Sequence, residues 1–357
     1  MGGSLALAAQ RYPGVEEVRG YDSDLGALAT ALDRGVITTA YGTVADVAAG
    51  ADVVIVCTPV GRIPALVEEC LGADPRPRLI MDLGSTKGSV IERLSTSARH
   101  RFVGGHPMCG GERTGVRFAR ANLYERATFF LCAPPEAPPE AYELAHSFVV
   151  QLLGARPVAI EPEVHDRIVA LVSHVPHVLA NVIMTEVGSF DSGGRRALYS
   201  VGPSFKDLTR VAGSNPRMWR DIFLENRDAV VRSLRSIAKE IGLFCDLLDT
   251  GDEQRISESI GAAAAYRQEL LAYEDISPDT LHQLSVRIPD EPGVLSRVMT
   301  ALGNATINVE DLVLHHFSRS VGGELTIYVA GEETATTAAE LLNRLGYPSV
   351  VSFAGGR

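Results

Sequence analysis

The sequence predicts a doubly wound α/β domain, then an all-helical domain, then a small α+β domain. Three observations predict this order. Apolar strands alternate with helical stretches up to about residue 150, strand signals vanish from about 155 to 277, and both return from about 280. We place the boundaries at 1–153, 154–277 and 280–357. A chain of 357 residues is too long for one ordinary core, in keeping with several domains.

The first domain is predicted from buried strands separated by helices. Residues 15–22, 51–59 and 78–85 are apolar runs closed by turn residues. Helical stretches at 25–35 and 63–72 lie between them, and the second is entered through a proline. Such alternation predicts a mainly parallel sheet with helices on its faces.

The second domain is predicted from helical periodicity. Residues 165–183, 215–248 and 256–272 carry apolar side chains at three-to-four spacing. Asn215 and Pro216 are a favourable N-cap and first helical residue. Long helices with such broad apolar faces often bury against a second copy, so we expect a homodimer with a helical core.

The last domain repeats strands and helices in a fixed order. We predict a strand at 281–289, a loop and helix at 290–304, strands at 307–317 and 324–330, a helix at 334–346 and a strand at 349–353. This βαββαβ order is ferredoxin-like.

The overall composition excludes several classes of partner. The net charge of -11, with no compensating basic stripe, argues against nucleic acid and acidic membranes. Hydrophobic residues at 46% and charged residues at 22% are typical of soluble globular proteins, and we find no run near the roughly 18 apolar residues of a membrane span. The five cysteines form no CxxC pair, which favours reduced thiols. We expect a cytoplasmic protein.

The N-terminal residues indicate a dinucleotide site. Gly2 and Gly3, before an apolar helix, match the end of the strand, G-x-G-x-x-G, helix fingerprint, whereas its first strand and first two glycines are not in the chain. Asp22, twenty residues after Gly2, would accept from a ribose hydroxyl and repel a 2′-phosphate, which favours NAD over NADP. Thr58 and Pro59, which close the second strand, are assigned to the same site.

Two further points bear on this site. The glycines could merely start a helix, with Asp22 as the cap of the next one. If the natural chain begins with this helix, cofactor binding should be severely weakened, so we expect a misplaced start or a clipped chain.

The stretch GGHPMCGGERTG supplies the first candidate catalytic group. His106 follows a strand-like run, so it should project from the carboxyl edge of the sheet, where ligands bind in open α/β folds. Pro107 keeps its backbone extended. Ser85 ends the preceding strand and could reach the same pocket. The alternatives are a loop histidine that caps a neighbour and a serine that caps a helix.

The helical domain supplies further candidates. His174 and His177 lie three apart, on one face of a helix that Pro176 bends. Because no carboxylate accompanies them in a zinc-like spacing, we expect no metal. Arg210 lies just before the helix that contains Trp219, and a lone arginine is most often a surface group.

Taken together, these motifs resemble the prephenate dehydrogenase family of tyrosine biosynthesis. The resemblance covers residue 2 to about 275 and rests on four segments: DLGSTKG, GGHPMCGGERTG, HDRIVALVSHVPHVLA and SFKDLTRVAGSNPRMWRDIFLEN. The segment IPDEPGVLSRVMTALGNATINVEDL resembles an ACT domain, a regulatory module that commonly binds amino acids.

The resemblance implies NAD-dependent oxidative decarboxylation of prephenate to 4-hydroxyphenylpyruvate, CO2 and NADH. His106 would accept the proton of the C4 hydroxyl as a neutral imidazole, and Ser85 would orient that hydroxyl or the imidazole. Arg210 would hold a substrate carboxylate with its planar fork. The same match places three more residues near the substrate: His177, His174 and Glu112.

Two other functions stay open. The same chemistry on arogenate, which has an amino group in place of the keto group, is not separated by any sequence feature. A catalytically inactive ACT sensor of amino acids is favoured by the missing strand and opposed by the intact set of site residues. We expect tyrosine or phenylalanine as the effector, bound at the loop DEPGVL and the helix that follows.

Overall fold

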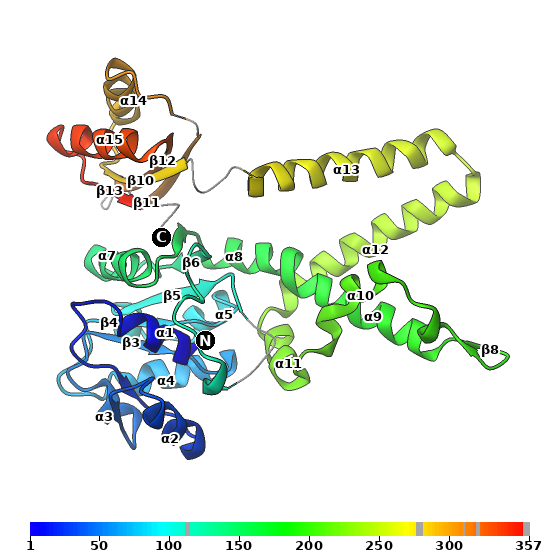
Figure 1. The fold of residues 1–357 in the computed structure, drawn as a ribbon, viewed down its shortest axis with the longest axis horizontal. Helices are drawn as coiled ribbons and strands as arrows, with labels where there is room; N and C mark the ends of the chain where they lie inside the picture. Colours follow the sequence, from blue (N-terminus) through cyan, green and yellow to red (C-terminus); the bar gives the residue numbers. More distant parts are fainter. Residues whose placement is uncertain (111–114, 276–280, 310, 319–321, 353–357) are drawn as a thin grey trace. The chain divides into compact units, whose positions relative to one another are not determined.

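The computed structural model describes residues 1–357 except 111–114, 276–280, 310, 319–321 and 353–357 (Figure 1). The chain divides into two compact units, Met1–Lys239 and Glu240–Arg357. The finer division into 1–153, 154–277 and 280–357 stays a prediction.

A five-stranded sheet forms the centre of the first unit, in the order β3-β4-β5-β6-β7. The strands are β3 (Val53–Val56), β4 (Leu79–Asp82), β5 (Phe102–Pro107), β6 (Thr128–Cys132) and β7 (Arg156–Ala159). Three of the four pairings are parallel, and β5 with β6 is antiparallel. The predicted α/β sheet is therefore confirmed, as a mixed sheet that is mainly parallel.

Helices cover both faces of this sheet (Figure 1). They are α1 (Gly2–Ala9), α3 (Val44–Ala48), α4 (Ile63–Cys70), α5 (Gly88–Glu92), α6 (Thr96–Arg99) and α7 (Pro139–Ser147), whereas α2 (Leu25–Asp33) packs with α1 in a separate cluster. Successive strand residues point to opposite faces. Ile80 accordingly packs in the core under α4, whereas Leu79 and Met81 pack in the core under α1 and α7. Burial on both faces explains the unbroken apolar run in β4.

The strand predicted at 15–22 needs correction. It is reduced to β1 (Arg19–Gly20), which pairs in parallel with β2 (Thr39–Ala40) in a separate two-stranded sheet. The preceding residues Glu16 and Glu17 are both exposed, and a two-strand pair has little apolar surface with which to extend.

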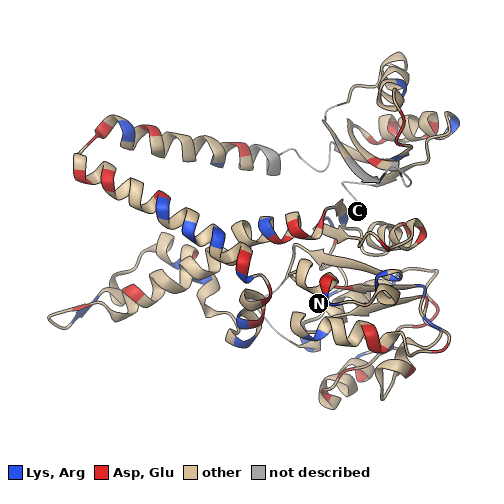
Figure 2. Cartoon of the chain, turned by 180° about the vertical axis from the view of Figure 1, so that it is seen from behind, with Lys and Arg blue, Asp and Glu red and all other residues tan. Residues whose placement is uncertain are grey.

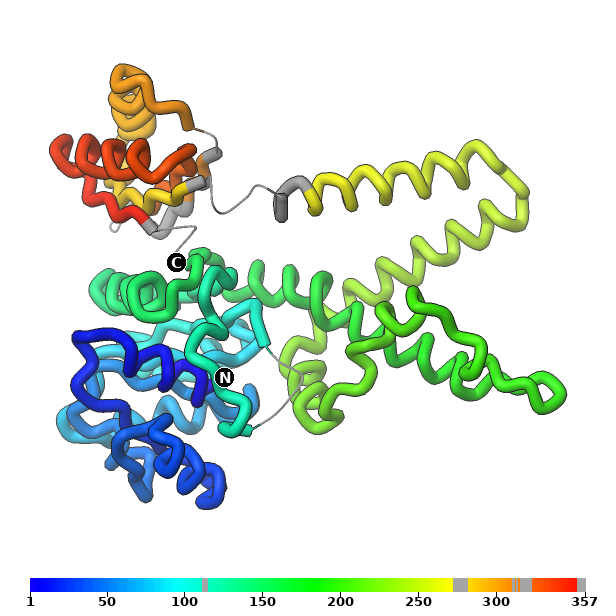
Figure 3. Tube along the Cα trace, viewed as in Figure 1, coloured from blue at the N-terminus to red at the C-terminus, as the bar shows by residue number. Residues whose placement is uncertain are grey.

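The helical part of the first unit begins with α8 (Pro162–Val169), a π-helical turn at Ala170–His174 and α9 (Val175–Ser189), which form one continuous path (Figure 3). The helix predicted at 165–183 is confirmed. Pro176 has no N–H to donate to the preceding turn, which gives a physical reason for the widened π-helical turn just before it. Next come α10 (Pro203–Thr209) and a 3₁₀ turn, η6 (Arg210–Gly213).

The helix predicted at 215–248 is broken in two at Asn226. The pieces are α11 (Pro216–Glu225) and α12 (Arg227–Thr250), which runs across the boundary between the units. Asn215 caps α11 by accepting from the N–H of Arg217, as predicted. Asn226 leaves the helical conformation, and its side chain is buried.

The stretch Pro162–Ser189 also corrects the sequence analysis. Within the described residues it is long enough to cross a membrane, and its most apolar 18-residue window has a mean hydropathy of 1.7. The earlier expectation that no run approaches that length was therefore wrong. Length and composition alone are weak evidence for a membrane, and this same stretch carries buried histidines and an aspartate.

The second unit contains the end of α12, α13 (Glu253–Asp275) and a four-stranded antiparallel sheet. Its elements are β10 (Leu281–Ile288), α14 (Val294–Asn304), β11 (Asp311–Ser318), β12 (Gly322–Ala330), α15 (Glu332–Arg344) and β13 (Ser349–Ser352). The strand order is β11-β12-β10-β13, and the predicted βαββαβ arrangement is confirmed. Leu284 and Val286 of β10 pack in one buried cluster with residues of α14 and α15.

The helix α13 carries a long uncharged stretch, visible as tan ribbon in Figure 2. Residues 259–266 contain no charged side chain. Ile260 and Tyr266 are exposed within the described unit, at 58% and 74%. These exposed apolar side chains are what a helical association surface requires.

Candidate functional site

Two glycines allow β5 to carry His106 into close contact with its neighbours. A Cβ on Gly105 would lie 2.6 Å from the carbonyl oxygen of Asp82 and 2.9 Å from the ring of Phe129. A Cβ on Gly104 would lie 2.8 Å from the Lys87 side chain. Neither position has room for a side chain, so the glycines that precede His106 have a packing role.

A buried ion pair fixes the loop that follows β4. The side chains of Asp82 and Lys87 are both fully buried and contact each other. Asp82 also accepts hydrogen bonds from the N–H groups of Gly84, at 2.8 Å, and Gly105, at 3.1 Å. A buried ion pair that also makes hydrogen bonds to the backbone holds a single geometry. Here the ion pair joins the end of β4 to β5.

His106 begins a chain of hydrogen bonds that leads into the helical part. Its Nδ1 lies 2.8 Å from Nε2 of His165, and Nδ1 of His165 lies 2.8 Å from Oδ1 of Asp166. Asp166 also accepts from the N–H groups of Lys87, at 2.8 Å, and Gly88, at 2.9 Å. The start of α8 is thereby joined both to β5 and to the loop after β4.

Both imidazoles at this junction are neutral near pH 7. Burial holds the pKa of His106 well below 6.5, and repulsion from His165 in its protonated form, from the Lys87 ammonium and from protonated His174 lowers it further. Burial also lowers the pKa of His165, although its hydrogen bond to Asp166 opposes this. A neutral imidazole at the sheet edge has the protonation state required of a general base.

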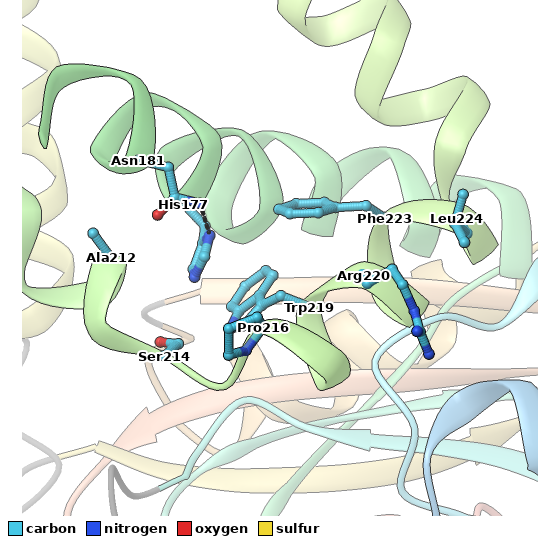
Figure 4. A pocket seen from close by; sticks show the side chains of 9 residues that line it. All are labelled: His177, Asn181, Ala212, Ser214, Pro216, Trp219, Arg220, Phe223 and Leu224. Atoms are coloured by element: carbon cyan, nitrogen blue, oxygen red, sulfur yellow. Dashed lines mark hydrogen bonds between the residues drawn. The ribbon is translucent and has the colours of Figure 1, made fainter. Parts of the chain in front are cut away.

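A second group of side chains surrounds an aromatic pocket of about 420 Å³ (Figure 4). His177 of α9 stacks on Trp219 of α11, with ring centroids 3.7 Å apart. Phe223 is edge-on to His177, and Asn181 donates to Nδ1 of His177 at 3.1 Å. Burial lowers the pKa of His177, with partial opposition from the backbone of Val211. This pocket combines apolar walls with a few polar groups, as ligand pockets do.

His174 lies behind this pocket and is not among its lining residues. It is only 1% exposed, and its ring meets Trp219 edge-on. Asn226 donates both to Nδ1 of His174, at 3.1 Å, and to the carbonyl of Asp166, at 2.8 Å. Burial lowers the pKa of His174 to about 4. His174 thus packs against Trp219, its place near the substrate stays a prediction, and Asn226 links the pocket to the histidine chain.

The other predicted substrate residues are placed as follows. Ser85 lies partly buried in the loop after β4, at the same sheet edge as His106. Arg210 is exposed and begins η6, which packs along α9. Glu112 lies outside the described residues.

The predicted cofactor residues gather at the start of α1 and the end of β3. Gly2 and Gly3 are the first residues of α1. A Cβ on Gly2 would lie 3.1 Å from Cβ of Cys57, which precedes the exposed Thr58 and Pro59. A helix N-terminus whose first two residues carry no side chain fits the pyrophosphate of a dinucleotide, because its N–H groups and dipole favour anions.

Asp22 is exposed after β1, and its Oδ1 accepts from the N–H of Asp24 at 2.9 Å. Asp24, not Asp22, caps α2, so the alternative that Asp22 serves as that cap was wrong.

Several site residues were not assigned a role from sequence. They are Asp82, Lys87, His165, Asp166, Trp219 and Asn226. His165 and Asp166 stand inside a motif used for the family resemblance, and an adjacent His-Asp pair at the start of an apolar helix was the signal available. Lys87 follows a buried strand in DLGSTKG with an aspartate five residues earlier, which could have indicated an ion pair.

The nucleotide-binding sheet and the helical part match two family models. Residues 5–159 match the nucleotide-binding domain of prephenate dehydrogenase, and residues 161–262 match its dimerization domain. The fold and the site define an oxidoreductase that uses a dinucleotide.

Known proteins with similar sequences and structures agree with these matches. The chain is 29% identical over 347 residues to prephenate dehydrogenase of Bacillus subtilis (strain 168), covering 96% of this chain and 93% of that protein. It is 30% identical over 283 residues to cyclohexadienyl dehydrogenase of Zymomonas mobilis, covering 78% and 95%. Prephenate dehydrogenase of Aquifex aeolicus, solved with hydroxyphenyl propionate and NAD+, has a TM-score of 0.70 at 29% identity, covering 76% and 94%.

The chain belongs to the prephenate dehydrogenase family, a family of NAD-dependent oxidoreductases. The resemblance drawn from the four sequence segments is confirmed at this level.

Proposed function

We propose that this chain oxidises prephenate with NAD and releases 4-hydroxyphenylpyruvate and CO2. The observation that carries this proposal is the placement of His106. Its imidazole is neutral, lies at the carboxyl end of β5 and is partly exposed to solvent. Ligands of doubly wound sheets bind at this edge.

The reaction requires one base for the hydroxyl proton of prephenate and contacts for its two carboxylates. NAD supplies the acceptor for the hydride that leaves C4 of prephenate. His106 takes the hydroxyl proton as the C4–O bond becomes a carbonyl. The ring carboxylate then leaves as CO2, its bonding electrons make the ring aromatic, and the proton returns to the phenolic oxygen. Aromatisation provides the driving force, so the protein mainly orients the substrate and moves one proton.

The remaining residues would orient and bind the substrate. Ser85, at the same edge as His106, would hydrogen-bond the C4 hydroxyl or the imidazole. Arg210 would bind a carboxylate with two N–H groups. His177 would offer a polar contact from the aromatic wall that it forms with Trp219.

A matrix of two substrates and two cofactors tests the proposed activity. Purified chain is incubated with prephenate or arogenate, each with NAD or NADP, and reduced cofactor is measured by absorbance. We expect the fastest reduction with prephenate and NAD, because the Asp22 carboxylate would repel the 2′-phosphate of NADP. Turnover of arogenate alone would change the substrate assignment. A folded chain that reduces neither cofactor with either substrate would favour the inactive sensor.

We also propose that the βαββαβ sheet of the second unit is an ACT domain that binds tyrosine or phenylalanine. Support comes from its ferredoxin-like strand order and from the loop before α14, where Gly293 has a left-handed φ of 85°. Calorimetry with each of the twenty amino acids tests this. We expect heat of binding for an aromatic amino acid. If none of the twenty amino acids gives heat of binding, the domain would be an assembly element only.

A cytoplasmic homodimer is the proposed form of the protein. The match of residues 161–262 to a dimerization domain supports the dimer, and free cysteines fit a reducing compartment. Light scattering should give twice the mass of one chain, whereas the mass of a single chain would contradict the dimer.

A further inference from the structure

The hydrogen positions along the histidine chain follow from its donors and acceptors. Asp166 already accepts one backbone N–H on each carboxylate oxygen, so it faces His165 as an acceptor and Nδ1 of His165 carries the hydrogen. A neutral imidazole has one ring hydrogen, which leaves Nε2 of His165 as an acceptor. Nδ1 of His106, 2.8 Å away, must then donate to it. The lone pair of neutral His106 is consequently on Nε2.

We propose that His165 and Asp166 are positioning residues that hold His106 in its Nδ1–H form and share the proton which Nε2 receives. The proposal rests on the proposed function, in which His106 is the base. As the substrate O–H bond breaks, an N–H bond forms at Nε2 of His106. The hydrogen between the two imidazoles can then shift to Nε2 of His165, which brings the positive charge beside the Asp166 carboxylate. Reversal of both shifts returns the proton to the product oxygen, with no change of redox state.

The surroundings favour this arrangement over one that relies on water. His165 is fully buried, with the ring of Phe130 edge-on at 5.3 Å. The charged groups that face the pair are Lys87 and Asp82 from the loop after β4 and Asp166 from α8, and His174 faces it from the π-helical turn. Lys87 opposes a positive charge on the pair, but it is itself paired with Asp82. Asp166 is then the carboxylate that stabilises the shared proton.

Nitrogen NMR of labelled histidine tests the tautomer directly. At pH ~8, where the histidines are neutral, the shifts of the two ring nitrogens show which one carries hydrogen. We expect Nδ1–H for His106 in the wild-type chain. In Asp166→Ala the acceptor that keeps the hydrogen on Nδ1 of His165 is lost, so we expect the His106 hydrogen to be found partly on Nε2. A wild-type His106 with hydrogen on Nε2, or a tautomer unchanged by Asp166→Ala, would overturn the proposal.

Kinetics of paired variants separate positioning from packing. Asp166→Ala should lower kcat by ~10²–10⁴ with little change in KM, on the order of the loss when the aspartate that holds the histidine tautomer in serine proteases is replaced. His165→Gln keeps a carbonyl that can accept from His106, whereas His165→Phe keeps only a ring. We expect His165→Gln to retain at least ~10-fold more kcat than His165→Phe, because an acceptor oriented toward Nδ1 preserves the tautomer. Equal loss in both variants would indicate packing alone and contradict the proposal.

His100→Gln is the matched control. His100 is exposed at the end of α6 and contacts the carbonyl of Thr96, outside the site. This variant should leave both kcat and the His106 tautomer unchanged. A wild-type chain that turns over neither substrate would contradict the proposed function, while the NMR spectrum would still decide the tautomer.

Discussion

Replacing His106 with asparagine is expected to lower kcat by ~10²–10⁴ and to leave KM for prephenate nearly unchanged. Asparagine is close to histidine in size and can still donate one hydrogen bond to His165. Its amide cannot accept a proton near neutral pH, so only the transition state loses its partner. Steady-state kinetics with saturating NAD measure this, and circular dichroism confirms that the variant is folded.

The expected loss depends on His106 alone and not on general disturbance of the sheet edge. His100→Gln, an exposed histidine on α6, should keep the wild-type kcat. A His106→Asn variant with wild-type kcat would remove His106 from catalysis. A variant with raised KM and unchanged kcat would make it a binding residue only.

Replacing Arg210 with alanine should mainly raise KM, by the equivalent of ~2–4 kcal/mol, or about 30- to 1,000-fold. The reason is the loss of a charge-assisted, two-point contact to a substrate carboxylate. Substrate titrations at saturating NAD measure the effect. Arg210→Lys keeps the charge but loses the planar fork, so its KM should lie between those of the wild type and Arg210→Ala.

Arg227→Ala provides the comparison for Arg210. Arg227 is an exposed arginine at the start of α12, paired with its neighbour Asp228. Its removal should leave KM unchanged, because a surface ion pair of this kind contributes little. An unchanged KM in Arg210→Ala would exclude Arg210 from the substrate site.

The fold was predictable where one local pattern dominated. Residues of β4 are buried on both faces of the sheet, so their apolar run was plain in the sequence. The length of the strand predicted at 15–22 was overestimated. The sequence pattern alone does not show that only Arg19 and Gly20 pair with a second strand. The break at Asn226 was missed because helical periodicity continues through it. Its cause is tertiary, since the Asn226 side chain turns inward to Asp166 and His174.

The site was predictable only for residues that motifs make conspicuous. His106 stood out between glycines, and Pro107 marked its backbone as extended. Its partner His165 is 59 residues away in sequence, so no spacing rule joins them. Trp219 and His177 likewise meet only because α9 and α11 pack together. The tautomer of His106 and the wall of the pocket both depend on contacts between elements that are distant in sequence. A single sequence does not show such contacts explicitly.

The pH dependence of kcat/KM for prephenate tests the central claim most directly, that neutral His106 takes the substrate proton. A base works only when unprotonated, so the rate falls as pH drops through its pKa. Burial, and after it repulsion from neighbouring groups when they are protonated, lower the pKa of His106 well below 6.5. We therefore predict full activity down to pH 6.5 and a loss below it that disappears in His106→Asn. If the His106→Asn variant kept wild-type activity and its rate fell over the same pH range as that of the wild type, the account would be contradicted.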